Sequence, residues 1–465
     1  MSSSPSSSGP WWRDLTRYHW FVFTVACLAW LFDCLDQQLF IIARNPAMQA
    51  LLPPGTASDV LKQWGGYSTA IFIAGWATGG LFFGAIGDRI GRAKTLALTV
   101  LLYSVCTGLS ATSRGVIDFA VYRFVTGLGV GGVFGLSVAL VADSLPDRAR
   151  PHALGLMQSL SAVGNVAAGA IAILIGYLET THIKPGSSWR YMFLIGALPA
   201  FLCVFIQIRL KEPEKWVKAR EAGRLTGARF GSYASLFGEA RWRKPALLGM
   251  LLCVSGVVGL WGVGFFTPEL VGDVIGKVLA KENVAPDQIP GRRLMWTGIN
   301  MIMQNLGSFF GMMTFTKLAS HYGRKPIFAI SFVTAFISTF LVFRYFSQPW
   351  HIFTLIPMMG FFQLGVFAGF AIYLPELFPT RLRSTGTSFC YNVGRFIAAS
   401  GPFTLGILQS HLAAGAVTAE AKLQAFRNAC CWVSLVFLLG LIALFFLPET
   451  KDRPMPEDVE PLPAK

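Results

Sequence analysis

Two carboxylates lie inside the first long apolar run of the chain, where a membrane helix normally carries none. The stretch LFDCLDQQLF (31–40) holds Asp33 and Asp36 at a spacing of three residues, which puts both on one face of a helix. An ionisable residue at bilayer depth is costly and marks an ion or substrate pathway by default. Neighbouring carboxylates disfavour double ionisation, so we predict that one of them exchanges a proton near neutral pH. We favour Asp36 as the proton site, with Asp33 tuning it.

Arg123, in the fourth apolar run, is the predicted partner of these carboxylates. With a rise of roughly 1.5 Å per residue, Asp33 lies about 20 Å and Asp36 about 24 Å from the inner membrane face, and Arg123 lies roughly 21 Å from it. Matching depths permit an ion pair between the two helices. Protonation would release Arg123 and deprotonation would recapture it, which predicts proton coupling. A permanent structural ion pair and sodium coupling are the alternatives.

Arg395 lies near the middle of the eleventh apolar run, in YNVGRF (391–396), at a depth where the second half has no acidic residue. An unpaired guanidinium there is expensive unless an anion visits it, and guanidinium binds carboxylate in a bidentate fork. We predict that Arg395 binds a substrate carboxylate; binding to backbone carbonyls or to the aspartates of the first run is the alternative. Polar residues at similar depth complete the candidate substrate site: Gln37, Asn165, Gln304, Asn305, Gln363, Tyr391 and Asn392. Trp76 and Trp261 are candidates for stacking on a substrate ring.

Long membrane helices must position these side chains, and the composition predicts them. Charged residues make up 14% of the 465-residue chain and hydrophobic residues 53%, whereas soluble domains carry about 25% charged residues. The first run is too long for a signal peptide and has no cleavage site, so it should stay as a helix. Twelve runs are long enough to cross a bilayer core of about 30 Å: 20–42, 67–87, 94–113, 117–142, 152–178, 190–209, 245–267, 296–317, 326–346, 352–374, 385–409 and 427–447.

The loops between these runs predict the orientation. With the N-terminus in the cytoplasm, 25 of the 39 Lys and Arg residues fall in cytoplasmic segments, in line with the positive-inside rule. Ten of them lie at 209–244, and they account for much of the net charge of +15 without a nucleic-acid partner. We interpret these ten as topology determinants, with contact to anionic lipid as the less favoured alternative. A second long loop is expected at 268–295.

The two halves of the chain repeat. DSLPDRAR (143–150) matches ELFPTRLR (376–383) at an offset of 233, and DRIGR (88–92) matches HYGR (321–324) at an offset of 232. Such a duplication predicts a transport site near mid-membrane between the halves. The predicted domains are a disordered cytoplasmic N-terminus, an N-terminal bundle, a cytoplasmic central loop, a C-terminal bundle and a cytoplasmic tail, at 1–19, 20–209, 210–244, 245–447 and 448–465.

Over about residues 18–453 the chain resembles the major facilitator superfamily. GAIGDRIGRAK (84–94) is similar to the signature loop between helices 2 and 3, and RFVTGLGVGG (123–132) to the helix 4 motif with its embedded arginine; PELFPTRLRSTG (375–386) and PETK (448–451) resemble markers shared by sugar porters and organic-ion transporters. The resemblance implies an all-α membrane protein of twelve transmembrane helices in two pseudo-symmetric six-helix bundles, with both termini cytoplasmic and transport by alternating access. It also implies a cytoplasmic gate that closes in the outward-facing state, formed by Asp88, Arg92, Asp143, Arg324 and Glu376. Ser320 and His321 replace the acidic and basic pair in the second copy, so this gate should be asymmetric.

The spacing of the aspartates also bears on the substrate. Aromatic-acid, sialate and related metabolite:proton symporters have an Asp-Gly-aromatic-Asp pattern, which Asp33-Cys34-Leu35-Asp36 resembles in both acids but not in the residues between them. Sugar porters typically have one aspartate, matching Asp36. Together with Arg395 this favours symport of a small organic-acid anion with a proton. A sugar or polyol porter is the main alternative, and a drug:proton antiporter or a transporter-like sensor is less favoured.

Other function classes lack support in the sequence. No motif of an enzyme site appears, and the eight cysteines fall in apolar runs without metal-ligand spacing, so we expect no metal and no cofactor. The expected partners are the substrate, the proton and the lipid bilayer. We expect a multi-pass monomer in the cell membrane, most simply a bacterial inner membrane.

Overall fold

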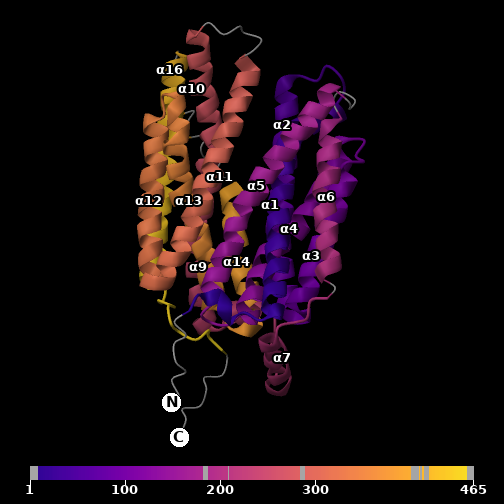
Figure 1. Ribbon diagram of the computed structural model, residues 1–465, viewed down its shortest axis with the longest axis vertical. Coiled ribbons are helices and arrows are strands. Elements are labelled where there is room, and N and C mark those ends of the chain that lie inside the picture. The colour runs from indigo at the N-terminus through magenta and orange to yellow at the C-terminus, as the bar shows by residue number, and fades with distance from the viewer. Residues whose placement is uncertain are drawn as a thin grey trace.

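The computed structural model describes residues 9–181, 187–207, 209–282, 289–399, 408, 411–412 and 418–457, and these residues form helices and loops without a strand. Two groups of long helices lie side by side (Figure 1). The first group contains α1 (Arg17–Leu51), α2 (Ser58–Ile90), α3 (Arg92–Ser110), α4 (Val116–Ser144), α5 (Arg150–Thr181) and α6 (Ser188–Gln207). We call it the N-terminal half.

The second group, which we call the C-terminal half, begins after two short helices, α7 (Glu214–Thr226) and α8 (Tyr233–Gly238). It contains α9 (Ala240–Gly262), α10 (Thr267–Lys281), α11 (Ile289–Tyr322), α12 (Arg324–Tyr345), α13 (Leu355–Tyr373), α14 (Arg383–Ala399), α16 (Ala419–Val433) and α17 (Leu439–Phe446). Short 3-10 helices lie at Trp11–Asp14 (η1), Gly264–Phe266 (η2), Pro349–Phe353 (η3), Leu374–Leu377 (η4), Thr380–Leu382 (η5) and Ser434–Leu438 (η6).

Nine helical segments among the described residues are long and apolar enough to cross a membrane. They coincide with nine of the twelve expected runs. The other three runs, 190–209, 296–317 and 385–409, overlap α6, α11 and α14, and residues 400–407 and 409 of the last one lie outside the described part. The chain is thus a multi-pass, all-helical membrane protein.

Two predicted loops contain helices. The central segment 210–244 holds α7, α8 and the first residues of α9, and residues 268–281 of the second predicted loop belong to α10. Helix α10 has proline in its first turn and buries Leu270, Val271, Val274 and Ile275. Apolar residues at this spacing cover one face of a helix. The prediction of a loop was wrong because charged residues on the other face interrupt the apolar run.

Close helix packing inside each half depends on glycine. A Cβ atom at Gly131 of α4 would overlap the Trp76 carbonyl oxygen of α2, and one at Gly75 of α2 would overlap the Phe124 carbonyl oxygen of α4. The same relation recurs between α11 and α13, where Gly307 meets the Pro357 carbonyl oxygen. Small residues let helix backbones approach in this way. Gly75 and Gly307 are 232 residues apart, so the duplication extends to the packing.

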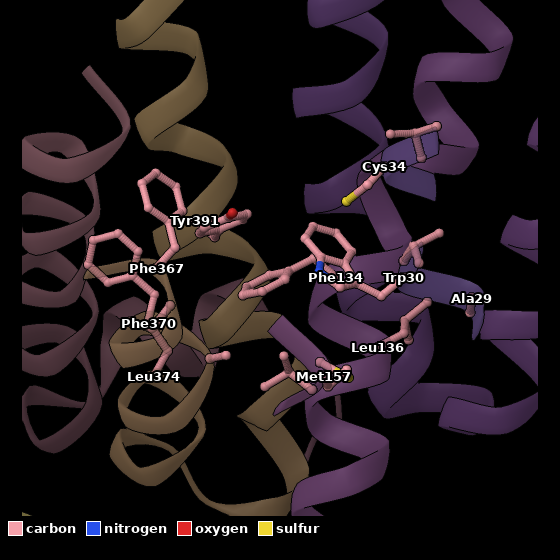
Figure 2. Packing of buried hydrophobic residues seen from close by; sticks show 14 of the residues in the cluster. Ala29, Trp30, Cys34, Phe134, Leu136, Met157, Phe367, Phe370, Leu374 and Tyr391 are labelled. Carbon is pink, nitrogen blue, oxygen red and sulfur yellow. The ribbon is translucent and has the colours of Figure 1, made fainter. Parts of the chain in front are cut away.

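Aromatic and aliphatic side chains from both halves meet in the middle of the molecule (Figure 2). Phe134 of α4 stacks on Tyr391 of α14 with ring centres 3.9 Å apart, and Trp30 of α1 packs on the other side of Phe134 at 5.2 Å. Tyr391 also contacts the Phe367 and Phe370 rings of α13. This apolar seam is where the polar site residues described below come together from both halves.

Replacing Gly131 by alanine should destabilise the protein, because the added methyl group overlaps a backbone that cannot move aside without shifting α2. Overpacking of this kind costs about 1–3 kcal/mol. Gly169→Ala is the matched control, since a Cβ there meets nothing within 4 Å and alanine favours a helix by up to about 1 kcal/mol. Thermal unfolding of both purified variants measures the difference. An equal or higher melting temperature for Gly131→Ala would contradict the packing described.

Candidate functional site

Helix α1 carries both aspartates into the interior of the protein. Asp33 and Asp36 are completely buried, and α1 packs against α4, α5 and α6. The two side chains have different surroundings, although they share a helix face. Asp33 accepts a hydrogen bond from Gln37 Nε2 at 2.9 Å, whereas Asp36 accepts one from the Thr107 hydroxyl of α3 at 2.8 Å. The second carboxylate oxygen of each residue has no hydrogen-bond partner among the described residues.

The expected direct ion pair between Asp36 and Arg123 is replaced by a bridge. Thr107 lies between them: its hydroxyl donates to Asp36 Oδ1, and Arg123 Nη2 approaches the same hydroxyl at 3.4 Å. The two charges still attract each other electrostatically. Thr107, the residue that joins the two side chains, was not indicated by the sequence.

Hydroxyl groups and rings hold the Arg123 guanidinium. Its Nε and Nη2 atoms donate to Ser110 Oγ at 3.0 and 2.6 Å, and Nη2 also donates to Thr126 Oγ1 at 3.1 Å. The Phe193 ring lies 4.6 Å from its Cζ atom, within the range of a cation–π interaction. Nη1 has no partner among the described residues. Arg123 is therefore solvated by the protein and keeps one free donor.

Arg395 lies at the interface of the halves. It projects from α14 of the C-terminal half, and its Cζ atom lies 3.6 Å from the centre of the Trp76 ring of α2 in the N-terminal half and 4.3 Å from that of Tyr391. Its Nη1 donates to Asn392 Oδ1 at 3.0 Å, and its Nε has no partner among the described residues. Asp33 is the carboxylate that interacts with it electrostatically. The sequence suggests Trp76 as a platform for a substrate ring. In the structure the Trp76 ring stacks on Arg395.

Of the remaining candidates, two form a contact between the halves and the others lie within the C-terminal half. Asn165 of α5 donates to Asn305 of α11 at 2.9 Å, so these two link the halves. Gln363 of α13 donates to the Gly259 carbonyl of α9 at 3.2 Å, inside the C-terminal half. Gln304 has a partly buried side chain on α11. One turn earlier the sequence analysis missed Asn300, which is completely buried with both side-chain polar atoms unpartnered among the described residues; its place within an apolar run was the available signal.

The predicted gate residues come together at one end of the molecule, the end where η1, α7 and residues 447–457 lie. We call this the α7 end. The Asp88 carboxylate accepts hydrogen bonds from the backbone N–H groups of Ser384 and Thr385 at 3.2 and 2.8 Å, at the start of α14. A carboxylate is favoured at a helix N-terminus. Since Asp88 belongs to α2 and the two amides to α14, this contact joins the halves.

A second contact between the halves involves Arg383, a residue that the sequence analysis missed. Asp143 forms ion pairs with Arg92 of its own half and with Arg383 of the C-terminal half, and all three side chains are completely buried. Arg324 and Glu376 pair at 2.8 Å within the C-terminal half. Arg383 stands within the repeated motif ELFPTRLR, and its position at the start of a helix was the signal. The α7 end is closed in this structure.

Two further glutamates repeat between the halves. Glu212 accepts hydrogen bonds from the backbone N–H groups of Ala93 and Lys94 at the start of α3. Glu449 does the same for Arg324 and Lys325 at the start of α12. Partial burial raises the pKa of Glu449, but the backbone donors outweigh that effect and leave the pKa below its usual value. KEPEK (211–215), after the first six helices, and LPETK (447–451), near the C-terminus, thus each supply a glutamate that caps a helix of their own half.

The site combines a buried guanidinium with buried carboxylates near the seam between the two repeated halves. Among the described residues, one donor of Arg395 and one oxygen each of Asp33 and Asp36 have no hydrogen-bond partner. Among the described residues no group of histidine, cysteine and acidic side chains is arranged to hold a metal ion.

Comparisons with known proteins agree with this architecture. The fold matches that of the proton:xylose symporter XylE of E. coli with a TM-score of 0.72 and 19% identity, over 94% of this chain and 98% of that one. The cis,cis-muconate transport protein of Acinetobacter baylyi is 28% identical over 73% of this chain and 76% of that protein. The benzoate transport protein of the same organism is 26% identical over 96% of this chain and 93% of its own length.

Fold, buried charges and repeated halves define a transporter of the major facilitator superfamily rather than an enzyme. The chain belongs to the sugar (and other) transporter family, whose model matches residues 18–459.

Replacing Thr107 by valine should weaken the link between Asp36 and Arg123. Valine keeps the shape of threonine but removes the hydroxyl, which leaves a buried carboxylate oxygen unpaired at a cost of about 1–3 kcal/mol. Thr107→Ser keeps the hydroxyl and is the control. We expect a lower melting temperature and slower transport in the valine variant only. Equal behaviour of the two variants would show that Thr107 acts through packing and not as a bridge.

Proposed function

We propose that this protein is a proton-coupled symporter that carries a small organic-acid anion across a bacterial inner membrane by alternating access. In this proposal the chain has twelve transmembrane helices in two six-helix bundles, acts as a monomer and has both termini in the cytoplasm. The bias of basic residues supports this orientation, and it makes the α7 end the cytoplasmic end. The closed contacts there then belong to an outward-facing state.

The observation that carries the proposal is the placement of Arg395. The residue is 5% exposed, its guanidinium rests on Trp76 of the opposite half, and its Nε is unpartnered among the described residues. Guanidinium recognises carboxylates in a planar, bidentate fork. A carboxylate substrate would supply the missing acceptor. The aromatic rings of Trp76 and Tyr391 beside it, with Trp261 against Trp76, suit an unsaturated or aromatic acid.

The carboxylates of α1 provide the coupling. Asp33 is the carboxylate that interacts electrostatically with Arg395 in this structure, and in the proposed cycle it balances that charge before substrate binds. A substrate carboxylate that binds Arg395 replaces this balance and leaves Asp33 as a buried, uncompensated anion. Such a charge is strongly disfavoured in a low-dielectric site, so Asp33 takes up a proton. Substrate and proton are then bound together, which is the condition for symport.

This mechanism gives the two aspartates different tasks. Asp36 is bonded to Thr107 and attracted to Arg123, and in the proposed cycle it keeps both contacts when substrate binds. The sequence favoured Asp36 as the proton site; the electrostatic contact with Arg395 makes us propose Asp33 for the coupled step and Asp36 for the organisation of the N-terminal half.

A sugar or polyol porter is the second candidate. Asn300 is a buried amide with no partner among the described residues, and Gln304 and Asn305 follow it on α11. Amides of this kind hydrogen-bond hydroxyl groups. Thermal-shift screening of the purified protein against small carboxylates and sugars, at two pH values, separates the candidates. Stabilisation by sugars alone would reverse the ranking.

Exchanging Asp33 for asparagine should abolish uphill accumulation of benzoate or muconate driven by a pH gradient and leave exchange across the membrane intact. Asparagine cannot release or bind the coupling proton but still fills the site. Proteoliposomes measure both activities, and Asp36→Asn is the comparison. Normal accumulation by Asp33→Asn, with loss confined to Asp36→Asn, would move the proton site to Asp36.

Replacing Arg395 by lysine or alanine should weaken binding of the carboxylate. Loss of a charge-assisted hydrogen bond of about 1.5–3 kcal/mol corresponds to a rise in apparent KM of roughly 10- to 150-fold, larger for alanine than for lysine. The control ligand is the uncharged amide of the same acid, which the wild type should reject and the alanine variant should no longer distinguish. Unchanged affinity for the carboxylate in both variants would exclude this role.

A further inference from the structure

Two hollows lie next to each other on the surface of the α7 end. One, of about 530 Å³, is lined by residues of the α7–α8 turn, the start of α9 and Arg381 of η5. The other, of about 390 Å³, lies between the last turn of α2 and α7. They share Gly227 and Ala228, so one turn of the chain separates them. Gly227 has a φ of +72° and ends α7, and a Cβ there would meet nothing within 4 Å.

The walls of these hollows are strongly basic. Six arginines and one glutamate line them: Arg89, Arg220 and Arg224 in the smaller hollow, and Arg229, Arg241, Arg381 and Glu239 in the larger one. Glu239 is already bound by Arg381, whose Nη2 donates to both of its carboxylate oxygens at 2.8 and 2.9 Å. The other five arginines form no ion pair with any described residue. Among the described residues, the five arginines other than Arg381 therefore carry positive charge that no carboxylate pairs with.

Aromatic side chains also contribute to the walls. Trp242 lines the larger hollow and Phe230 the smaller one. Arg241 lies over the Trp242 ring at 4.7 Å, and Arg220 lies over the Trp216 ring at 4.9 Å. These contacts hold the guanidinium groups without using their hydrogen-bond donors. The site is thus arranged to present free N–H groups beside apolar surface.

The segment between the hollows is attached to both halves of the protein. Gly231 donates its backbone N–H to the Arg381 carbonyl at 3.1 Å, and its own carbonyl accepts from Arg89 Nε at 3.2 Å. Its φ is +58°, and a Cβ at this position would overlap the Ala85 carbonyl oxygen of α2. Arg89 belongs to the N-terminal half and Arg381 to the C-terminal half, so the walls are complete only while the α7 end is closed.

We propose that the two hollows form one binding site for a phosphate-bearing anion, either the headgroup of an acidic lipid of the inner leaflet or a free phosphate compound, and that its binding favours the closed α7 end. Guanidinium groups match phosphate geometry in a bidentate manner. The cytoplasmic leaflet is negatively charged and attracts basic segments beside membrane helices. The guanidinium donors in both hollows would bind the phosphate group at a defined position, in addition to this general attraction.

Native mass spectrometry of the detergent-solubilised protein, with dioleoylphosphatidylglycerol or dioleoylphosphatidylcholine added, tests the site. The double variant Arg224→Gln with Arg241→Gln removes one arginine from each hollow. Its control, Lys218→Gln with Arg243→Gln, removes the same charge from the same two helices outside the hollows. We expect the first variant to retain at least about fivefold less phosphatidylglycerol, at unchanged phosphatidylcholine binding, and the control to resemble the wild type. Equal losses in both variants would overturn the proposal, because general attraction would then explain the binding.

Two further measurements complete the test. Millimolar inorganic phosphate that displaces phosphatidylglycerol would identify a free phosphate compound as a ligand of the same site, and failure to displace it would identify the lipid. Hydrogen exchange of the Ser384 and Thr385 amides, which donate to Asp88 and are not among the residues that line the hollows, reports closure of the α7 end. Phosphatidylglycerol should slow their exchange in the wild type and in the control variant. Unchanged exchange in lipid-bound wild type would disprove the conformational part of the proposal.

Discussion

The cost of burying charge in a membrane governs how this protein is built. Each charged residue in its interior is held by groups that replace water: Arg123 by hydroxyl groups and rings, Arg395 by Trp76 and Asn392, and Asp36 by Thr107. None of these arrangements satisfies every polar atom. Burying the remaining polar atoms without a partner costs free energy. A proton or an anion that binds them would remove this cost. Permanent ion pairs would have given a more static protein.

The same constraint takes another form at the α7 end. There the two halves meet through Asp88 at the start of α14 and through Asp143 with Arg383. Such contacts are strong while water is excluded, yet each partner is readily hydrated once the halves separate. The apolar contact of Phe134 with Tyr391 lies deeper. Polar contacts at the end and apolar contacts in the middle allow the interface to open without leaving a large hydrophobic surface in water.

The sequence predicted the parts of this structure that follow from periodicity and charge. Apolar runs located nine spans, and helix rise brought Asp36 and Arg123 to one level. It could not predict Thr107, because hydroxyl residues are frequent in membrane helices and only tertiary contact distinguishes one of them. Arg383 was missed because the positive-inside rule already explains a basic residue beside a membrane span. The prediction of a loop at 268–295 was wrong because one apolar face is enough to stabilise α10 when a neighbouring helix covers that face. The pairing of Arg395 with Trp76 required knowledge of which faces of α2 and α14 meet.

The glycine contacts between α2 and α4 have a mechanical consequence. Where backbone touches backbone, no side chain is available to change rotamer, so the two helices move as one stiff body. Trp76 and Asp88 both lie on α2, twelve residues or about 18 Å apart. A tilt of α2 that loosens the ring under Arg395 must therefore displace the carboxylate under α14. The stiff helix pair thus connects the ring under Arg395 to the carboxylate at the start of α14.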